Sequence, residues 1–232
     1  MEARLCGRAL EIGGLLYRGA EAEVYEARWF CMPAVVKVRP PKPYRHPRID
    51  ELLRTRRTVA EARAMYAALR AGVSVPAVYL VDPLEKIIVM ERLEGISLAH
   101  LVEADSGRAL EAARRLGSMA ARLHAAGVAH GDLTTSNVVV VGDEVFLVDF
   151  GLASLDADED DYAVDVHLFM RSLESTHPDH VEDMLKSFLE GYRQVAGGDA
   201  VENLMRRVEE IRLMGRYREE RRRSVWGQVE QP

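Results

Sequence analysis

The stretch HGDLTTSN, from His130 to Asn137, is the part of the sequence from which the fold can be worked out. Asp132 is followed five positions later by Asn137, and the β-branched run VVVV comes directly after. A second acidic motif, DFG, begins at Asp149. Phosphoryl transfer requires a carboxylate that accepts a hydroxyl proton and hard oxygen ligands for magnesium. We therefore interpret Asp132 as a general base, and Asn137 and Asp149 as magnesium ligands.

The residues between these two motifs predict a hairpin. The apolar segments NVVVV and EVFLVD flank Gly142-Asp143, a residue pair that favours a tight turn between antiparallel strands. A hairpin over residues 138–148 would bring Asn137 and Asp149 side by side. The two proposed ligands, although far apart in the chain, would then face the same cation.

Two charged residues upstream fit the same chemistry. The chain has four lysines against 27 arginines, yet Lys37 stands inside the apolar strand AVVKV, where a compact ammonium would suit a phosphate. Glu61 lies on a predicted helix among small residues, from which it could pair with Lys37. Taken singly, the lysine could lie at a strand edge with its ammonium in water, and the glutamate could be an exposed helix residue. The ordered set of Lys37, Glu61, HxDxxxxN and DFG favours the functional interpretation.

The order of the predicted elements indicates an α+β chain with two lobes. We expect three strands in residues 8–39, a loop at PPKPYRHPR, a helix over 50–71, and two strands in AVYLVD and KIIVMERL. Beyond the hairpin, helices are expected over residues 109–127, 162–175, 178–195 and 200–223. The predicted units are an N-terminal lobe over 1–93, a helical lobe over 94–215, and a basic tail over 216–232.

Composition and charge limit the classes of function. Of the 232 residues 48% are hydrophobic and 29% charged, and no apolar run approaches the roughly 18 residues of a membrane span, so no membrane contact is expected. Two cysteines, Cys6 and Cys31, argue against a disulfide scaffold or a zinc site and fit a cytoplasmic location. The net charge is −6, but residues 37–57 and 206–223 are strongly basic. These segments are either solvated faces or contacts to an anionic partner.

With its VVK strand, helix glutamate, HGDLTTSN and DFG, the chain resembles the protein-kinase-like fold. The resemblance implies ATP and Mg²⁺ as cofactors, a small β-rich N-lobe, and a reduced helical C-lobe without a full activation segment. VMERLEG resembles the hinge between the lobes, with Met90 as gatekeeper and the backbones of Glu91 and Leu93 binding adenine. His130 and the helix residue Asp165 would support the catalytic loop.

Departures from the usual kinase pattern narrow the resemblance. The glycine-rich loop is reduced to YRGAEAEVY, with Gly19 its only glycine, which we expect near the nucleotide. Gly131 follows His130 where many kinases have an arginine that answers to a phosphorylated activation loop. Only 13 residues separate Gly151 from Asp165, and they include no APE motif. We therefore expect control by bound partners rather than by an activation segment.

These features together resemble the small atypical kinase/ATPase of the KEOPS complex, the PRPK-like family. The matching segments include VVKVRPPKPYRHPRID, LLRTRRTVAEARAM, HGDLTTSN and DFGLAS, and they cover nearly the whole chain. The family implies a serine/threonine protein kinase or ATP hydrolase that supports threonylcarbamoyl modification of tRNA adenosine. It implies a transferase subunit on the C-lobe, a small subunit on the N-lobe, and tRNA contacts through the basic tail. The tail residues in question are Arg216, Arg218, Arg221, Arg222 and Arg223.

Three other functions stay open at the level of the sequence. A small-molecule kinase of the antibiotic or sugar type shares HGD and a trailing asparagine, but DFG and the PYRHPRID run count against it. RIO-type kinases are also small, and we rank them lower because they lack a clear DFG. A nucleotide-binding scaffold without catalysis is disfavoured because Lys37, Asp132, Asn137 and Asp149 are all present.

Overall fold

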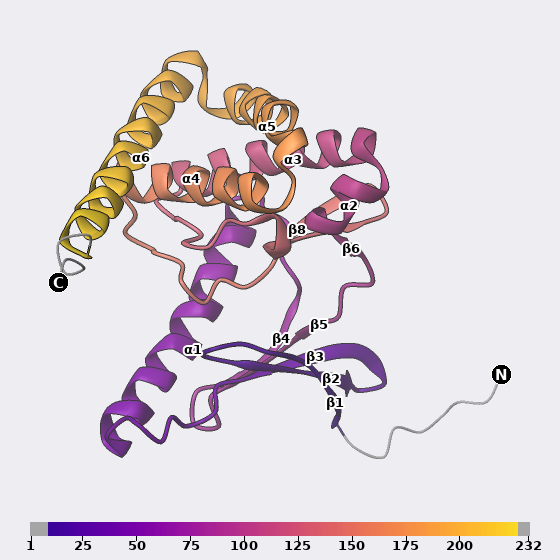
Figure 1. The fold of residues 1–232 in the computed structure, drawn as a ribbon. Coiled ribbons are helices and arrows are strands. Elements are labelled where there is room, and N and C mark those ends of the chain that lie inside the picture. The colour runs from indigo at the N-terminus through magenta and orange to yellow at the C-terminus, as the bar shows by residue number, and fades with distance from the viewer. Residues whose placement is uncertain (1–8, 227–232) are drawn as a thin grey trace.

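The N-terminal part of the molecule is a twisted antiparallel sheet. The structure, a computed structural model, describes the backbone of residues 9–226 and the side chains of residues 9–214. The sheet has the strand order β1-β2-β3-β5-β4 (Figure 1). Its strands are β1 (Leu10–Arg18), β2 (Glu23–Trp29), β3 (Met32–Val38), β4 (Val78–Asp82) and β5 (Ile87–Glu91). The expected strand–strand–strand, helix, strand–strand order of this region is confirmed.

A single long helix, α1 (Pro47–Arg70), connects β3 to β4 and rises from the sheet towards the helical part (Figure 1). It begins three residues before the expected position, because a proline lacks only an N–H that the first helical turn does not use. The inward face of α1 buries Ala64, Met65 and Ala68 in the main hydrophobic core, which also contains Met90 of β5. This packing fixes α1 against the sheet.

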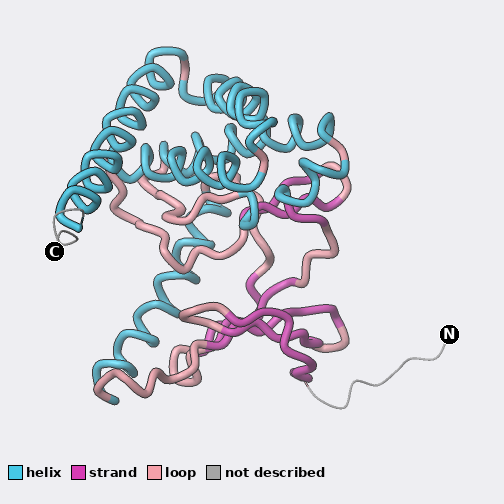
Figure 2. The backbone as a smooth tube through the Cα atoms, in the orientation of Figure 1, coloured by secondary structure: helices cyan, strands magenta, loops and turns pink. Residues whose placement is uncertain are grey.

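The C-terminal part is mostly helical (Figure 2). Its helices are α2 (Leu98–Ala104), α3 (Ser106–Ala125), α4 (Glu159–Thr176), α5 (Val181–Ala196) and α6 (Gly198–Trp226), with short 3₁₀ turns at Thr135–Asn137 and Pro178–His180. A second sheet consists of β6 (Ile96–Ser97), β7 (Val138–Val141) and β8 (Glu144–Leu147). The β7–β8 hairpin and the four expected helices are present. Helix α2 and strand β6 were not predicted, because their residues ISLAHLVEA are too few to show a helical or strand periodicity.

Helices α3 and α5 come into backbone contact at two glycines. A Cβ atom on Gly117 would lie 1.8 Å from the carbonyl oxygen of Phe188, and one on Gly191 would lie 1.7 Å from that of Arg114. Ser118 adds a hydrogen bond from its hydroxyl to the Gly191 carbonyl at 2.9 Å. Glycine is required at both positions because any side chain would force the helices apart. The packing holds α3, which leads into HGDLTTSN, in one place.

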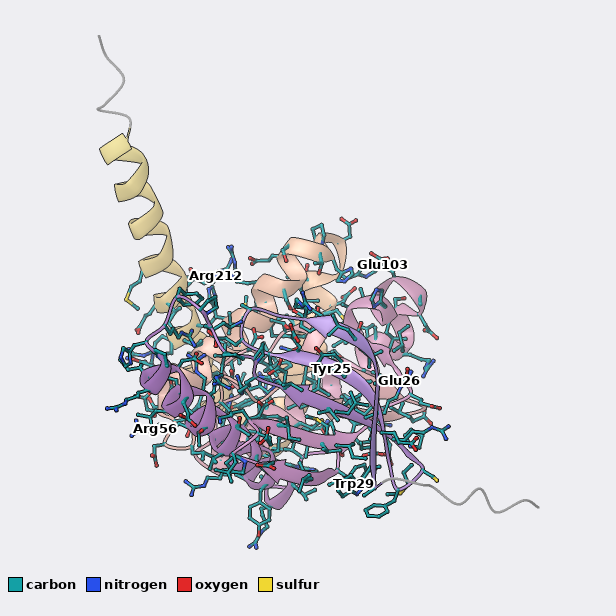
Figure 3. The ribbon with its side chains drawn as sticks, turned by 90° about the horizontal axis from the view of Figure 1, so that it is seen from below. Tyr25, Glu26, Trp29, Arg56, Glu103 and Arg212 are labelled. Carbon is teal, nitrogen blue, oxygen red and sulfur yellow. The ribbon has the colours of Figure 1, made fainter. Side chains whose placement is uncertain are left out.

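None of the helices in residues 9–226 combines the length and apolar character that a membrane-spanning segment needs. Cys31 is disulfide-bonded, and Cys6 lies outside the described residues. Figure 3 shows the sheet from below with Tyr25, Glu26 and Trp29 of β2, and Arg56 on α1 at the edge of the molecule. The boundaries expected at residues 93 and 215 stay a prediction.

Candidate active site

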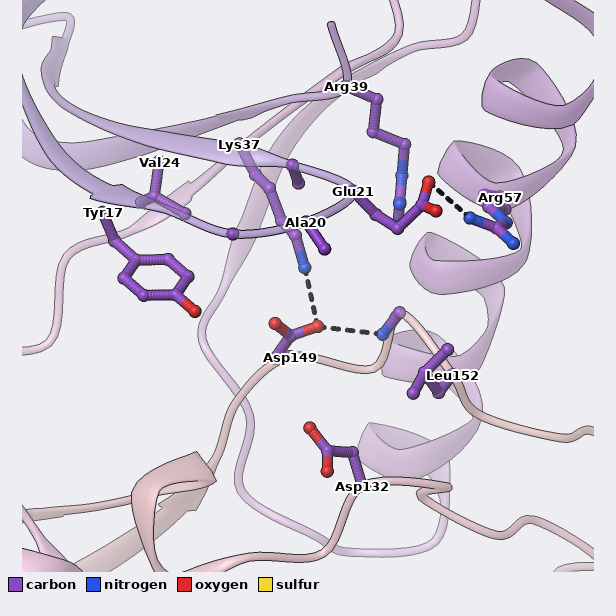
Figure 4. Close-up of a pocket in the computed structure, with 13 residues that line it drawn as sticks. Tyr17, Ala20, Glu21, Val24, Lys37, Arg39, Arg57, Asp132, Asp149 and Leu152 are labelled. Atoms are coloured by element: carbon purple, nitrogen blue, oxygen red, sulfur yellow. Dashed lines mark hydrogen bonds and ion pairs between the residues drawn. The ribbon is translucent and has the colours of Figure 1, made fainter. Parts of the chain in front are cut away.

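A cavity of about 230 Å³ lies between the sheet and the loops that follow α3 and β8 (Figure 4). Four residues expected at the site line it: Gly19, Lys37, Asp132 and Asp149. Residues from four separate segments of the chain therefore meet in one pocket. The remaining lining residues are Tyr17, Ala20, Glu21, Ala22, Val24, Arg39, Arg57, Gly151 and Leu152.

Lys37 is the centre of the charged groups in the pocket. Its Nζ donates to Glu61 Oε1 at 2.6 Å and to Asp149 Oδ1 at 2.7 Å, and its side chain is 8% exposed. The expected pair with Glu61 is present, because β3 and α1 place the two side chains face to face. Partial burial acts to raise the pKa of Asp149. The Lys37 ammonium and the Gly151 N–H outweigh this effect, so that the pKa lies below its usual value and Asp149 is anionic at neutral pH.

Asp132 and Asn137 are joined by hydrogen bonds within the loop over residues 130–137. Asn137 Nδ2 donates to both the backbone oxygen and Oδ2 of Asp132, each at 2.9 Å. This orientation leaves Asn137 Oδ1 and Asp132 Oδ1 as the oxygens for other partners. The hairpin brings Asn137 towards Asp149 as expected, since Val148 N–H donates to the Asn137 carbonyl at 3.0 Å. The two carboxylates of Asp132 and Asp149 face the same space (Figure 4).

Two buried residues fix the backbone of the loop over residues 130–137. Asp165 of α4, with no exposed surface, accepts the N–H of His130 at 2.6 Å and of Gly131 at 2.7 Å. The His130 ring contacts Val148 O through Nε2 at 3.1 Å and Phe150 at a centroid distance of 4.7 Å. Burial lowers the pKa of His130, which therefore is neutral. The loop geometry thus depends on groups that lie behind the pocket.

Gly131 is a steric requirement of this loop. Its φ is +77°, and a Cβ atom would lie 2.2 Å from the carbonyl oxygen of Leu152, directly after DFG. The backbone near Leu152 cannot easily move away from Gly131, because Ala129 and Ser154 exchange two hydrogen bonds of 3.1 and 3.0 Å. The position is closed not only to arginine but to every side chain. The segment after DFG is short and tied to the catalytic loop.

The loop between β1 and β2 is held by ion pairs, which sequence reasoning missed. Glu21 pairs with Arg45 at 2.8 Å and with Arg57 at 2.6 Å. The Arg45 hydrogen bond lowers the pKa of Glu21 against a smaller opposing effect of burial. Arg45 lies in the proline-rich segment between β3 and α1, and the length and unusual sequence of this segment were the only signals of a further role. We call these two ion pairs the Glu21 clamp. The same loop contains Gly19, whose N–H donates to Ala22 O at 2.9 Å.

Not every expected site residue lies at the cavity. Met90 is buried in β5, and Glu91 at its end donates its N–H to Ala77 O at 2.8 Å. Neither they nor Leu93 line the cavity described above. The tail residues Arg216, Arg218, Arg221, Arg222 and Arg223 belong to the backbone of α6, but their side chains lie outside the described residues.

A comparison with protein families matches residues 44–163 to the RIO domain. This match corrects the lower rank that we gave to RIO-type kinases, because the matched residues include DFG and the motif therefore does not exclude the family. Among solved structures, the chain is similar to the Rio2 kinase in complex with ADP/Mg²⁺-phosphoaspartate from Chaetomium thermophilum. The TM-score is 0.56 at 17% identity, with 86% of this chain and 71% of that chain covered, which supports the kinase-like fold.

Sequence relatives are closer. The chain is 41% identical over 212 residues to the KEOPS complex subunit Bud32 of Pyrococcus abyssi, covering 88% of this chain and 96% of that protein. It is 37% identical over 215 residues to the EKC/KEOPS complex subunit Tp53rkb of Mus musculus, covering 88% and 87%. A probable bifunctional tRNA threonylcarbamoyladenosine biosynthesis protein of Methanosarcina barkeri is 40% identical, and the match covers 91% of this chain but 37% of that protein. The chain belongs to the RIO-domain family and to the family of the KEOPS complex subunit Bud32.

Proposed function

We propose that this protein is an ATP-dependent phosphotransferase or ATP hydrolase that supports threonylcarbamoyl modification of tRNA as a subunit of a KEOPS-type assembly. The observation that carries the chemistry is the meeting of Lys37, Asp132 and Asp149 at one cavity, with Asn137 bonded to Asp132. The biological setting is supported by the names of the relatives, which are KEOPS subunits and tRNA threonylcarbamoyladenosine biosynthesis proteins. We also propose a cytoplasmic location, with which these names are compatible.

The residues fit ATP and magnesium. No three His, Cys, Asp or Glu side chains form a metal-binding cluster within the described part of the chain, so a cation here would depend on phosphate oxygens as well as on the protein. Asp149 and the Oδ1 oxygen of Asn137 would hold it. When bound, magnesium neutralises the charge that develops on the phosphate oxygens during transfer.

The chain's own groups have separate roles in this proposal. Lys37 binds a phosphate of the nucleotide while Glu61 keeps the ammonium aimed into the pocket. Gly19 lets the β1–β2 loop lie close to the phosphates. Asp132 accepts the proton of the attacking hydroxyl or water at Oδ1, since Asn137 occupies Oδ2.

Asp132→Ala tests the reaction. The change should lower turnover of Mg²⁺-ATP by roughly 10²–10⁴, measured as phosphate release and as phosphotransfer to protein. Arg56→Ala, a change at an exposed arginine of α1, is the control. Unchanged turnover in Asp132→Ala would rule out the general-base role.

The setting needs a separate test. Affinity purification from native cells followed by mass spectrometry should recover a tRNA threonylcarbamoyl transferase, which we place on the helical lobe, and a small subunit, which we place on the sheet lobe. Removing the chain after Gly215 should weaken tRNA binding and flatten its salt dependence, because fewer phosphates would be neutralised. Recovery of sugar-metabolism enzymes instead would favour a small-molecule kinase.

A further inference from the structure

Arg39 is a buried arginine that lines the pocket and has no role in the proposed reaction. It follows Lys37 by two positions, just after β3, and its side chain is 5% exposed. Its backbone is fixed on both sides. The N–H donates to Lys86 O at 3.1 Å, and the carbonyl accepts from Arg54 Nη1 at 3.2 Å. The point from which the side chain starts is therefore set by the fold.

The guanidinium meets the second oxygen of Glu61. Arg39 Nη2 donates to Glu61 Oε2 at 2.6 Å, while Lys37 Nζ donates to Oε1 at the same distance. The Glu61 side chain is only 1% exposed. The carboxylate thus has two cationic partners, one on each oxygen: Lys37 in β3 and Arg39 directly after it. Arg39 Nη2 also lies 3.2 Å from the place that a Cβ on Gly151 would occupy, beside DFG.

The second partner matters when a nucleotide is bound. Lys37 also pairs with Asp149 and lines the cavity, so its ammonium is the group that must turn its charge towards phosphate. A buried carboxylate that shared its only counter-ion would be left poorly compensated, at a large cost in free energy. With Arg39 in place, Glu61 keeps one full ion pair whatever Lys37 binds.

We propose that Arg39 is a positioning residue that holds Glu61, and with it α1, in the paired arrangement without any signal from an activation segment. The inference rests on the proposed ATP site and deepens it. This role agrees with the short, fixed segment after DFG. If a buried arginine already holds α1 in the paired arrangement, no phosphorylated loop is needed to move α1 into place. Arginine suits this position better than lysine, because the guanidinium is planar and permanently charged.

The first test uses the free protein and needs no activity. Amide hydrogen exchange is measured in residues 58–64 of α1 for the wild type, Arg39→Met, Arg39→Lys and the exposed control Arg56→Ala. Arg39→Met should speed exchange there by roughly 10- to 100-fold, the range for a lost hydrogen bond to a charged group, and Arg39→Lys by less. Exchange unchanged in both Arg39 variants would overturn the proposal.

The second test asks whether Arg39 acts through Glu61. Arg39→Met should lower kcat/KM for Mg²⁺-ATP by roughly 10- to 100-fold in the wild type, but should have little further effect in Glu61→Gln. Equal losses in both backgrounds would mean that Arg39 acts directly on the nucleotide, and would overturn the positioning role. A wild type without turnover would count against the proposed function alone, since the exchange measurement does not depend on it.

Discussion

Replacing Gly131 by alanine separates two costs that the structure assigns to this position. The first is the positive φ of +77°, which costs an L-residue about 1–2 kcal/mol. The second is the new Cβ, 2.2 Å from the carbonyl oxygen of Leu152, where ordinary contacts begin at 3.4 Å. One of the two segments must therefore move by about 1.2 Å, the difference between these distances. Overpacking of this kind costs about 1–3 kcal/mol.

Gly127 provides the matched control. Its φ is +72°, but a Cβ there would meet nothing within 4 Å. Gly127→Ala should therefore lose only the backbone contribution, and the two variants share the effect of alanine on the unfolded chain. The free energy of unfolding, measured with urea by circular dichroism, should be lower in Gly131→Ala than in Gly127→Ala by about 1–3 kcal/mol.

Turnover of Mg²⁺-ATP should also be lower in Gly131→Ala than in Gly127→Ala, by more than the smaller folded fraction accounts for. The Gly131 N–H bonds Asp165, and the adjacent Asp132 would move with it. Equal stability of the two alanine variants would refute the contact with Leu152. Equal turnover would refute the idea that this contact positions Asp132.

Two further predictions concern the helical part. Gly191→Ala should lower the free energy of unfolding by about 3 kcal/mol, because the new Cβ would lie 1.7 Å from Arg114 O. Gly198→Ala should not lower it, because a Cβ there would meet nothing within 4 Å. Thermal melting of both variants checks this. Burial raises the pKa of Tyr192 to about 12, and its hydroxyl lies 2.9 Å from His124 Nδ1. The neutral phenol is favoured in the folded state, so its contribution to stability is present below the usual pKa of 10.0 and is lost as pH rises towards about 12. Urea unfolding at about pH 9 and pH 11 should show a steeper loss in the wild type than in Tyr192→Phe, and equal losses would contradict this assignment.

The candidate site could be predicted from the sequence, because the order and spacing of its residues distinguish it from chance matches to single motifs. Lys37, Glu61 and Asp149 lie far apart in the chain. Lys37 and Glu61 lie in elements whose type could be predicted, and Asp149 follows the hairpin, which a turn pair between β-branched runs indicates. Their contacts at 2.6 and 2.7 Å then follow from the fold. Their chemical roles stay a prediction until they are tested.

Arg39 and the Glu21 clamp could not be predicted in the same way. Arg39 is one of 27 arginines, and nothing in its neighbours VKVRPP shows that its side chain turns inward rather than to solvent. Glu21 and Arg45 meet only because the proline-rich segment folds back beside the β1–β2 loop. Such contacts depend on loop conformation, which short-range patterns do not determine. The start of α1 was misplaced for a related reason, since prolines that read as loop also suit a first helical turn.

The glycine contact between α3 and α5 has a consequence for motion. Two helices whose backbones touch cannot slide along each other, because a shift of one residue would bring a Cβ atom against the partner's carbonyl group. HGDLTTSN begins only a few residues after α3 ends, so it belongs to a rigid base. Any adjustment to an incoming nucleotide or a neighbouring subunit would then fall to parts of the molecule outside this helix pair.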